Sequence, residues 1–439
     1  MSTLPAEFLD PRTPTDVVVT DTAPPPITDP TLGMPLGTPP AGATPPPPNP
    51  VHRLVTAGDS LTHGLSSGAV FRTDLSWPAQ VARRLGIANF AFPTHGGPLD
   101  GLPVNVETLL RRLQDKFGTS LGLVDKLRLP LTARKLLDRN EDYWERGDGH
   151  RPPGTSVRYH NIGIYGWDLR DALSYDAGRA ATAASAETAD DFGNIKPDND
   201  NAIAASTVLA PFGPSATQIG AARWFGDNGG IDTLVVALGS NNALGAVVSK
   251  KVRWSGADFG DLVSKKQYTV WRPTHFATEF GVLADALRAV PARQVILATV
   301  PHVTIAPFAK GVNPDDHGQK WRPGSRYFPF YTDPWIDEGS FRPNKHRKLT
   351  HQQARAIDSA IDQYNETICN AVRSARRDGR DWQILDLCGL LDGLAERRFK
   401  RDSDAAYNNN WLEVELPAPI DDLDSRFFMS DAGGRLAGG

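Results

Sequence analysis

Apolar residues cluster in short segments that the pattern predicts as strands. These segments are 51–57, 157–162, 233–238, 294–300 and 382–387. Three of them are near-continuous apolar runs, as expected for strands that are covered on both faces. Helical periodicity lies between them, at 77–86, 276–290 and 349–377. Alternating strands and helices favour an α/β fold with a parallel sheet and helices on both faces. Ligands of such sheets lie at the carboxyl ends of the strands.

The first 50 residues have a different pattern, without periodicity. They are rich in Pro, Thr and Ala and end in a proline run at 43–50. Proline removes backbone donors and favours extended polyproline II, so we predict a disordered arm or semi-rigid spacer followed by one domain at 51–439. Within this domain, some segments are too long for plain connections, and we expect lids or small subdomains there. They span about 92–156, 183–230 and 303–345.

Composition and charge narrow the class of protein. Of 439 residues, 40% are hydrophobic and 22% are charged, which is ordinary for a globular chain, and the net charge of -4 gives no electrostatic footprint for nucleic acid. No stretch approaches the ~18 apolar residues of a transmembrane segment. The N-terminus has no basic region followed by an apolar one, so a secretory signal is not supported. The default location is cytoplasmic, and both export by another route and the oligomeric state stay open.

The two cysteines, Cys369 and Cys388, lie in apolar-rich elements. We expect two buried, reduced thiols, because that is the usual environment of cysteine. Spacing alone does not decide whether they form a disulfide. Neither cysteine has sequence neighbours that suggest zinc, and we expect no metal and no cofactor.

The strongest chemical signal is Gly58-Asp59-Ser60-Leu61-Thr62-His63-Gly64, directly after the first predicted strand. Ester hydrolysis by serine needs an exposed hydroxyl on a tight turn, with backbone N–H groups free to meet the developing oxyanion. Glycines on both sides of Ser60 allow that turn and the close approach of a substrate. We therefore predict Ser60 as a nucleophile.

Two further motifs follow later strands. Asn161-Ile162-Gly163-Ile164-Tyr165-Gly166-Trp167 comes after the second strand, and Leu238-Gly239-Ser240-Asn241-Asn242 ends the most apolar one. A side-chain amide such as that of Asn241 can stabilise an oxyanion, whereas Asn242 is better suited to capping the next helix.

Together the three motifs, with Ser76-Trp77-Pro78, resemble the sequence blocks of the GDSL/SGNH hydrolases, in family order. The resemblance spans roughly 51–439. It implies a three-layer α/β/α sandwich with a flavodoxin-like parallel sheet of about five strands. It also implies an oxyanion hole made by the N–H groups of Ser60 and Gly166 and the side chain of Asn241. Gly163 is the competing assignment for the glycine donor.

The general base that this family uses is missing from the sequence. Relatives carry an Asp-x-x-His motif near the C-terminus, and none of the ten histidines here has Asp three residues before it. We therefore expect a chain truncated at its C-terminus. Alternatively another histidine serves, with His302 after the fourth strand the best placed, and His63 poorly placed on the serine's own turn.

The sequence thus predicts a serine esterase or lipase that acts on a small-molecule or lipid ester through an acyl-enzyme on Ser60. Two alternatives stay open. One is a non-catalytic relative that binds such ligands, and the other is an acyltransferase that uses the same serine. Substrate and acyl-chain preference are not determined, because a family does not fix them.

Overall fold

The computed structural model describes residues 4–20, 24–41, 47–118, 123–151, 156–186, 196–306, 308–313, 327–336 and 338–394. They divide into two compact units. The Ser60 unit comprises residues 49–167 and 172–234. The His302 unit comprises residues 1–48, 168–171 and the described residues from 235 to 394.

The chain has an α/β fold with a sheet of four parallel strands, in the order β1-β5-β6-β10. These strands are β1 (His52–Gly58), β5 (Ile231–Ala237), β6 (Ala292–Ala298) and β10 (Asp381–Leu385). Four of the five predicted strands are therefore confirmed to within about two residues. The boundary between the two units falls inside β5.

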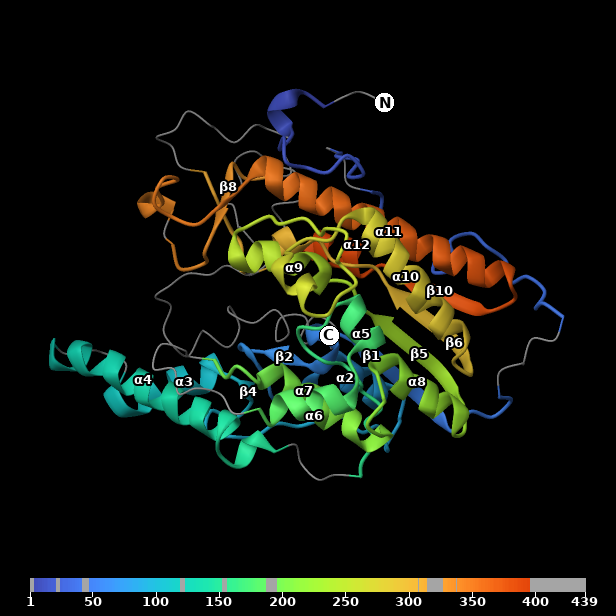
Figure 1. The fold of residues 1–439 in the computed structure, drawn as a ribbon, viewed down its shortest axis with the longest axis horizontal. Coiled ribbons are helices and arrows are strands. Elements are labelled where there is room, and N and C mark those ends of the chain that lie inside the picture. The colour runs from blue at the N-terminus through green and yellow to red at the C-terminus, as the bar shows by residue number, and fades with distance from the viewer. Residues whose placement is uncertain are drawn as a thin grey trace. The chain divides into compact units, whose positions relative to one another are not determined.

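Besides β1, the Ser60 unit contains further helices and short strands (Figure 1). They are α1 (Ser60–His63), β2 (Leu65–Ser66), β3 (Ala69–Val70), η2 (Thr73–Leu75), α2 (Trp77–Arg84), β4 (Leu102–Pro103), α3 (Val106–Phe117), α4 (Leu123–Glu145), η3 (Asp148–His150), α6 (Ala177–Ala184), α7 (Asp200–Leu209), η4 (Ala210–Phe212) and α8 (Gln218–Asp227). α8 packs on β1, and α6 packs on α7. The long insertions therefore carry secondary structure of their own, since α3 and α4 lie within the first and α7 and α8 within the second.

The segment predicted as the second strand is the exception. Residues 157–162 form one parallel bridge, between Thr56 and Asn161. Its backbone follows β1 nevertheless, because Thr56 N–H donates to His160 O at 2.9 Å and Ile164 N–H donates to Gly58 O at 2.9 Å. The segment is extended beside β1 and departs from regular strand geometry where polar side chains replace backbone partners.

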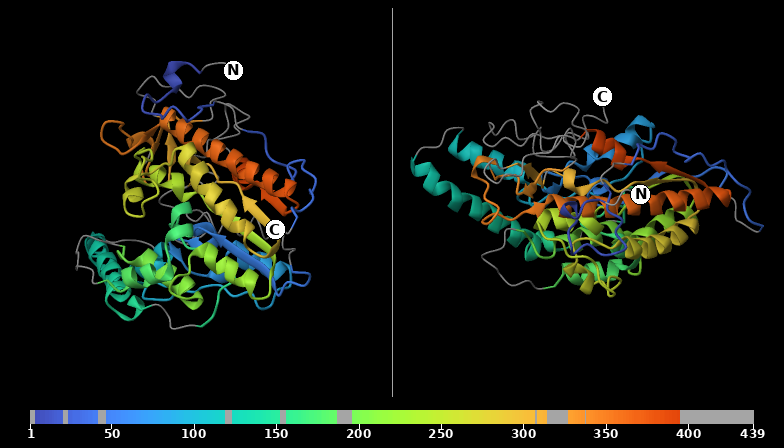
Figure 2. Two further views of the ribbon diagram at one scale, coloured as in Figure 1. Left: turned by 45° about the vertical axis from the view of Figure 1, so that its right-hand side comes forward. Right: turned by 90° about the horizontal axis from the view of Figure 1, so that it is seen from above.

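The His302 unit is built around β6 and β10, which pair in parallel from Asp381↔Gln294 to Leu385↔Ala298. Its remaining elements are η1 (Ala6–Phe8), α9 (Asn241–Ser249), η5 (Ser264–Gln267), α10 (Pro273–Arg288), η6 (Val303–Ile305), β7 (Lys310–Val312), β8 (Phe330–Thr332), η8 (Glu338–Ser340), β9 (Leu349–Thr350), α11 (His351–Arg377) and α12 (Leu387–Leu394). α5 (Leu169–Ser174) lies across the boundary of the units. α10 and α11 run side by side, and α11 packs on β10 (Figures 1 and 2).

α11 shows why these residues form a long helix. Thr350 and Gln353 form a capping box, in which each side chain accepts from the other residue's backbone N–H. Its apolar side recurs with helical spacing, as the buried Ile357, Ile361 and Ile368 illustrate. The predicted helix at 349–377 is therefore confirmed.

The described part of the third insertion forms an antiparallel sheet, β7-β8-β9. Tyr327, Phe328 and Tyr331 are buried there, and the rings of Phe328 and Tyr331 meet edge to face. These aromatic side chains form part of a local core.

The N-terminal arm makes hydrogen bonds to the rest of the His302 unit. Val18 N–H donates to Gln363 Oε1 at 2.8 Å, and Gly37 N–H donates to Arg376 O at 2.8 Å. Asp16 accepts from Arg272 Nε at 2.9 Å. Within its described residues the arm forms no helix or strand beyond η1. Its hydrogen bonds run instead to side chains and a backbone carbonyl at the start of α10 and along α11.

Candidate active site

Ser60 lies on a tight strand-to-helix turn. It is the first residue of α1, directly after β1 and Asp59, and it is half-buried. The carboxylate of Asp59 accepts from Leu61 N–H at 3.2 Å, which caps the helix. Gly64 ends α1 in the left-handed conformation, with φ 95°, and its N–H donates to Ser60 O. The motif therefore makes a closed single turn with the serine at its start.

The Ser76-Trp77-Pro78 motif packs against this turn. A Cβ on Gly64 would lie 2.9 Å from Ser76 Cβ, so the turn and the start of α2 touch where only glycine fits. Ser76 Oγ donates to Thr73 O at 2.7 Å and holds that approach. Two parts of the family resemblance, separated in sequence, are thus neighbours in the structure.

Asn161 joins the second motif to the serine turn. Its Nδ2 donates to Thr62 O at 2.7 Å, while its Oδ1 accepts from Gly163 N–H at 3.0 Å and from Thr56 Oγ1 at 3.3 Å. The side chain is fully buried. Asn161 therefore replaces the backbone partners of a regular strand and connects β1, α1 and its own segment.

The hydrogen bonds of Asn161 distinguish the two glycines that are candidates for the oxyanion donor. The N–H of Gly163 is already bonded to Asn161, and a Cβ on Gly163 would lie 2.5 Å from His63 N. Gly163 is therefore a packing glycine. Gly166 is exposed and has φ +77°, and among the hydrogen bonds of the described residues none uses its N–H. Of these two glycines, Gly166 is the one whose N–H is left for a ligand.

Gln218, which sequence reasoning did not single out, joins the same strands. From the start of α8, its Nε2 donates to Gly58 O at 2.8 Å and to Ile162 O at 2.6 Å, and the residue is fully buried. A buried amide that satisfies two strand ends fixes their separation. No sequence pattern marks it, because its partners are backbone carbonyls far away in the chain.

His63 supports the turn and does not act as a base there. It is fully buried, and its Nδ1 accepts from Tyr165 N–H at 3.2 Å. Burial lowers the pKa of His63 well below its usual value, and the nearby His95 lowers this pKa further. His63 is thus a neutral imidazole that positions the backbone between Gly163 and Gly166.

Asn241 lies in the His302 unit and is the first residue of α9, half-buried. The expectation that Asn242 caps this helix is wrong: α9 begins at Asn241, and Ser240 occupies the cap position. Asn242 is instead fully buried, with its Oδ1 accepting from Leu169 N–H at 3.3 Å.

His302, the alternative base, follows β6 as predicted but is 1% exposed. Its Nδ1 lies 2.7 Å from Asp392 Oδ2, and its Nε2 lies 2.9 Å from Asp362 Oδ1. A general base needs one ring nitrogen free to take the proton of the serine. Because carboxylates occupy both nitrogens, this arrangement does not favour His302 as the base.

Cys369 and Cys388 are both free and buried, as expected. The sequence suggested no metal ligands near them, yet the fold brings His302 and Asp392 to Cys388. Within the described residues, only these three side chains form a group that could hold a metal ion.

No protein-family model matches this chain, and comparisons with curated proteins and with solved structures found no similar protein at a significant level. Among the helices that the structure describes, none has the length and apolar character needed to cross a membrane.

Proposed function

We propose that this chain is a serine esterase or lipase of the GDSL/SGNH type, with an acyl-enzyme on Ser60. One observation carries the proposal. Asn161 holds the second motif beside the serine turn and consumes the N–H of Gly163, so that the N–H of Gly166 is the one left exposed. Such a donor beside a serine on a tight turn is what acyl transfer requires.

In the proposed reaction Ser60 Oγ attacks the ester carbonyl. The N–H groups of Ser60 and Gly166 hold the oxyanion. That the side chain of Asn241 is a third donor is a prediction from the family resemblance alone. The alcohol leaves, and water then releases the acid from the serine. The buried Asn161 and Gln218 are positioning residues, because their bonds run to the backbone of β1, α1 and the second motif.

The five-stranded SGNH fold belongs to the same proposal. The backbone of residues 160–164 bonds to Thr56 and Gly58 with the spacing of a parallel neighbour. Counting this segment beside β1 would extend the order of the sheet to five, which supports the finer fold.

One observation favours the ligand-binding alternative. The two histidines considered as bases are both buried: His63 accepts a hydrogen bond at Nδ1, and His302 has a carboxylate beside each ring nitrogen. A serine without a base is a weak nucleophile. The same turn could then bind an ester without hydrolysing it.

Hydrolysis of p-nitrophenyl esters from acetate to palmitate tests the proposal. Ser60→Ala should lower the rate by about 10³-fold or more, whereas Ser66→Ala, a nearby half-buried serine, should leave it unchanged. Asn241→Ala should lower it by about 10²–10³-fold, the typical effect of losing one oxyanion donor.

Three other outcomes separate the alternatives. Equal rates in the parent chain and Ser60→Ala would refute the nucleophile. Ester binding without turnover would identify the ligand-binding protein. A new ester formed from an added alcohol, faster than the free acid, would identify an acyltransferase.

A further inference from the structure

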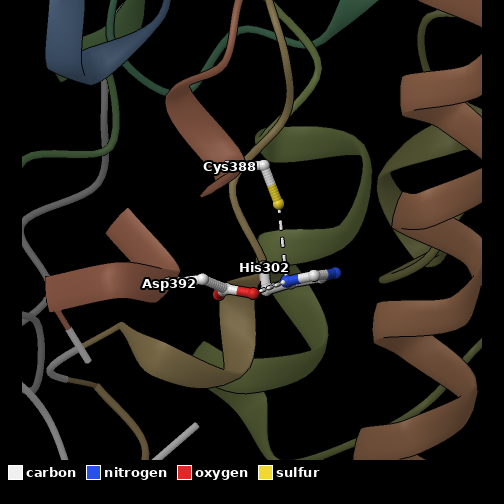
Figure 3. A group of neighbouring side chains, drawn as sticks. All are labelled: His302, Cys388 and Asp392. Carbon is white, nitrogen blue, oxygen red and sulfur yellow. Dashed lines mark hydrogen bonds and ion pairs between the residues drawn. The ribbon is translucent and has the colours of Figure 1, made fainter. Parts of the chain in front are cut away.

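Three potential metal ligands meet in the interior of the His302 unit (Figure 3). His302 comes from the segment after β6, while Cys388 and Asp392 lie on α12. One ligand atom from each lies within 4.8 Å of the others. All three residues are buried, with exposures of 1%, 7% and 3% respectively. Nitrogen, sulfur and oxygen donors in one small group are the set that borderline divalent metals such as zinc prefer.

The local structure of α12 directs these side chains toward one another. Cys388 and Asp392 are four residues apart, which places them on the same face of α12. The start of α12 is held by Thr299, whose Oγ1 accepts from Cys388 N–H at 2.8 Å. Asp386, directly before α12, also holds this first turn, because its Oδ1 accepts from Gly389 N–H at 2.9 Å.

Asp362 supplies the outer partner that metal-bound histidines usually have. From α11 its Oδ1 lies 2.9 Å from His302 Nε2, on the side of the ring away from the cysteine. A carboxylate there accepts the Nε2–H, fixes the tautomer and turns the Nδ1 lone pair toward Cys388 and Asp392.

The distances between the three ligand atoms are close to those around a metal ion. Ligand atoms around a tetrahedral zinc ion lie roughly 3.3–3.6 Å apart. His302 Nδ1 and Cys388 Sγ are 3.4 Å apart, while Nδ1 and Asp392 Oδ2 are 2.7 Å apart, a hydrogen-bond distance. All three ligand atoms lie within 4.8 Å of one another, so the side chains would have to shift by about 1 Å to reach the spacing around zinc.

We propose that His302 Nδ1, Cys388 Sγ and Asp392 form a binding site for one zinc-class divalent ion, with Asp362 as its outer carboxylate and the fourth position open to water. In the metal-free cluster Nδ1 lies 2.7 Å from Asp392 Oδ2, a hydrogen-bond distance that requires one proton between the two atoms, and the thiol of Cys388 holds another. Binding forms bonds from the metal to nitrogen, sulfur and oxygen and releases two protons to solvent, one from between Nδ1 and Asp392 and one from the thiol. The buried net charge is then unchanged, which removes the main obstacle to placing a cation there.

Cobalt(II) titration of the full chain, after removal of metal with a chelator, tests this site. We expect one cobalt per chain, with a thiolate-to-cobalt charge-transfer band and the visible bands of a four-coordinate ion. Cys388→Ala should abolish the charge-transfer band. Cys369→Ala, which removes the other buried cysteine, should leave it intact. Because binding displaces protons, the affinity should rise with pH.

A second variant keeps all three ligands and protects the test against misfolding. Asp362→Asn should weaken cobalt and zinc binding about 10–100-fold, with the band position nearly unchanged. Absence of the band in the parent chain would overturn the proposal. So would a band that survives Cys388→Ala, a band that disappears in Cys369→Ala, or an affinity that Asp362→Asn leaves unchanged.

Discussion

The buried histidines of the two units have opposite environments. In the Ser60 unit, His63 and His95 are buried with their rings 5.6 Å apart, and burial lowers the pKa of His95 to about 4. In the His302 unit, His302 is equally buried but has a carboxylate within 2.9 Å of each ring nitrogen. The same side chain is therefore a neutral packing group in one unit and the centre of a charged cluster in the other.

The difference shows that burial alone does not decide what a histidine does. Desolvation disfavours the charged ring wherever it occurs, and only a facing carboxylate compensates for that cost. The neutral pair stabilises the serine turn by packing and by accepting the Tyr165 N–H. The His302 cluster instead places two carboxylates and a thiol around one imidazole, which is a starting point for binding a cation.

The largest effect is expected from breaking the charged cluster. In metal-free buffer, Asp392→Asn removes one carboxylate from His302 and should lower the free energy of unfolding by about 3–5 kcal/mol, because a buried charge loses its partner. Urea unfolding measures it. Asp285→Asn is the matched control, since its carboxylate is 81% exposed beside Arg288 and should cost less than about 1 kcal/mol. Equal costs for the two variants would show that the cluster carries no charge.

Acid should destabilise the Ser60 unit through its neutral histidines. The folded state binds fewer protons than the unfolded chain between pH 6.5 and about 4, so stability is present above this window and is lost as the pH falls through it. Protonation of His95 should lower the free energy of unfolding by at most about 3 kcal/mol. Hydrogen exchange of amides in this unit, against pH, measures it.

His95→Phe keeps a ring in contact with Trp144 and should flatten this pH dependence. His150→Phe, at a half-buried position of the same unit, serves as the control. If the stability of His95→Phe depends on pH as steeply as that of the parent chain, His95 is not the histidine whose pKa is lowered by burial.

Replacing one glycine in each unit by alanine tests how tightly the two units are packed at these positions. Gly163→Ala places a Cβ 2.5 Å from His63 N and should cost about 1–3 kcal/mol by overpacking the neutral pair. Gly281→Ala in α10 meets no atom within 4 Å and should stabilise its helix by about 0.5–1 kcal/mol. Thermal or urea unfolding distinguishes the signs. A neutral Gly163→Ala would contradict the close approach of the second motif to α1.

The smallest expected effect concerns the arm of the His302 unit. Asp16→Ala removes bonds to Arg272 Nε and Thr274 Oγ1 and should weaken docking by about 1 kcal/mol, seen as faster proteolysis of residues 4–20. Asp29→Ala, whose bonds stay within the arm, is the control.

Mild acid should act on the arm in the same direction as Asp16→Ala. Burial alone raises the pKa of Asp16, but hydrogen bonds from Thr274 and Arg272 outweigh it and hold this pKa below its usual value. Docking is therefore complete at neutral pH and is lost as the pH falls below the ordinary range for aspartate. Equal proteolysis of the Asp16→Ala variant and the parent chain at neutral pH would show that Asp16 does not anchor the arm.

Much of the fold was predictable because its signals are local. The apolar run at 294–300 became β6, and the long amphipathic pattern at 349–377 became α11. The segment 157–162 was not predictable as it stands, since Asn161 satisfies backbone groups that a regular strand would pair with backbone. The hydrogen bonds of the arm were not predictable for a related reason: composition reports what a segment cannot do alone, and the partners of the arm lie at the start of α10 and on α11.

The sequence by itself determined the strand-to-helix turn at Ser60, the glycines around it and the order of the motifs, because turns and periodicity depend on near neighbours in the chain. Only the tertiary structure showed that the N–H of Gly163 is bonded to Asn161 while Gly166 is exposed, because these properties depend on contacts between distant parts of the chain. Only the tertiary structure brought His302 to Cys388, 86 residues away. Such a cluster forms only when folding brings residues that are distant in the sequence together and excludes water from them, and no local sequence pattern reports this.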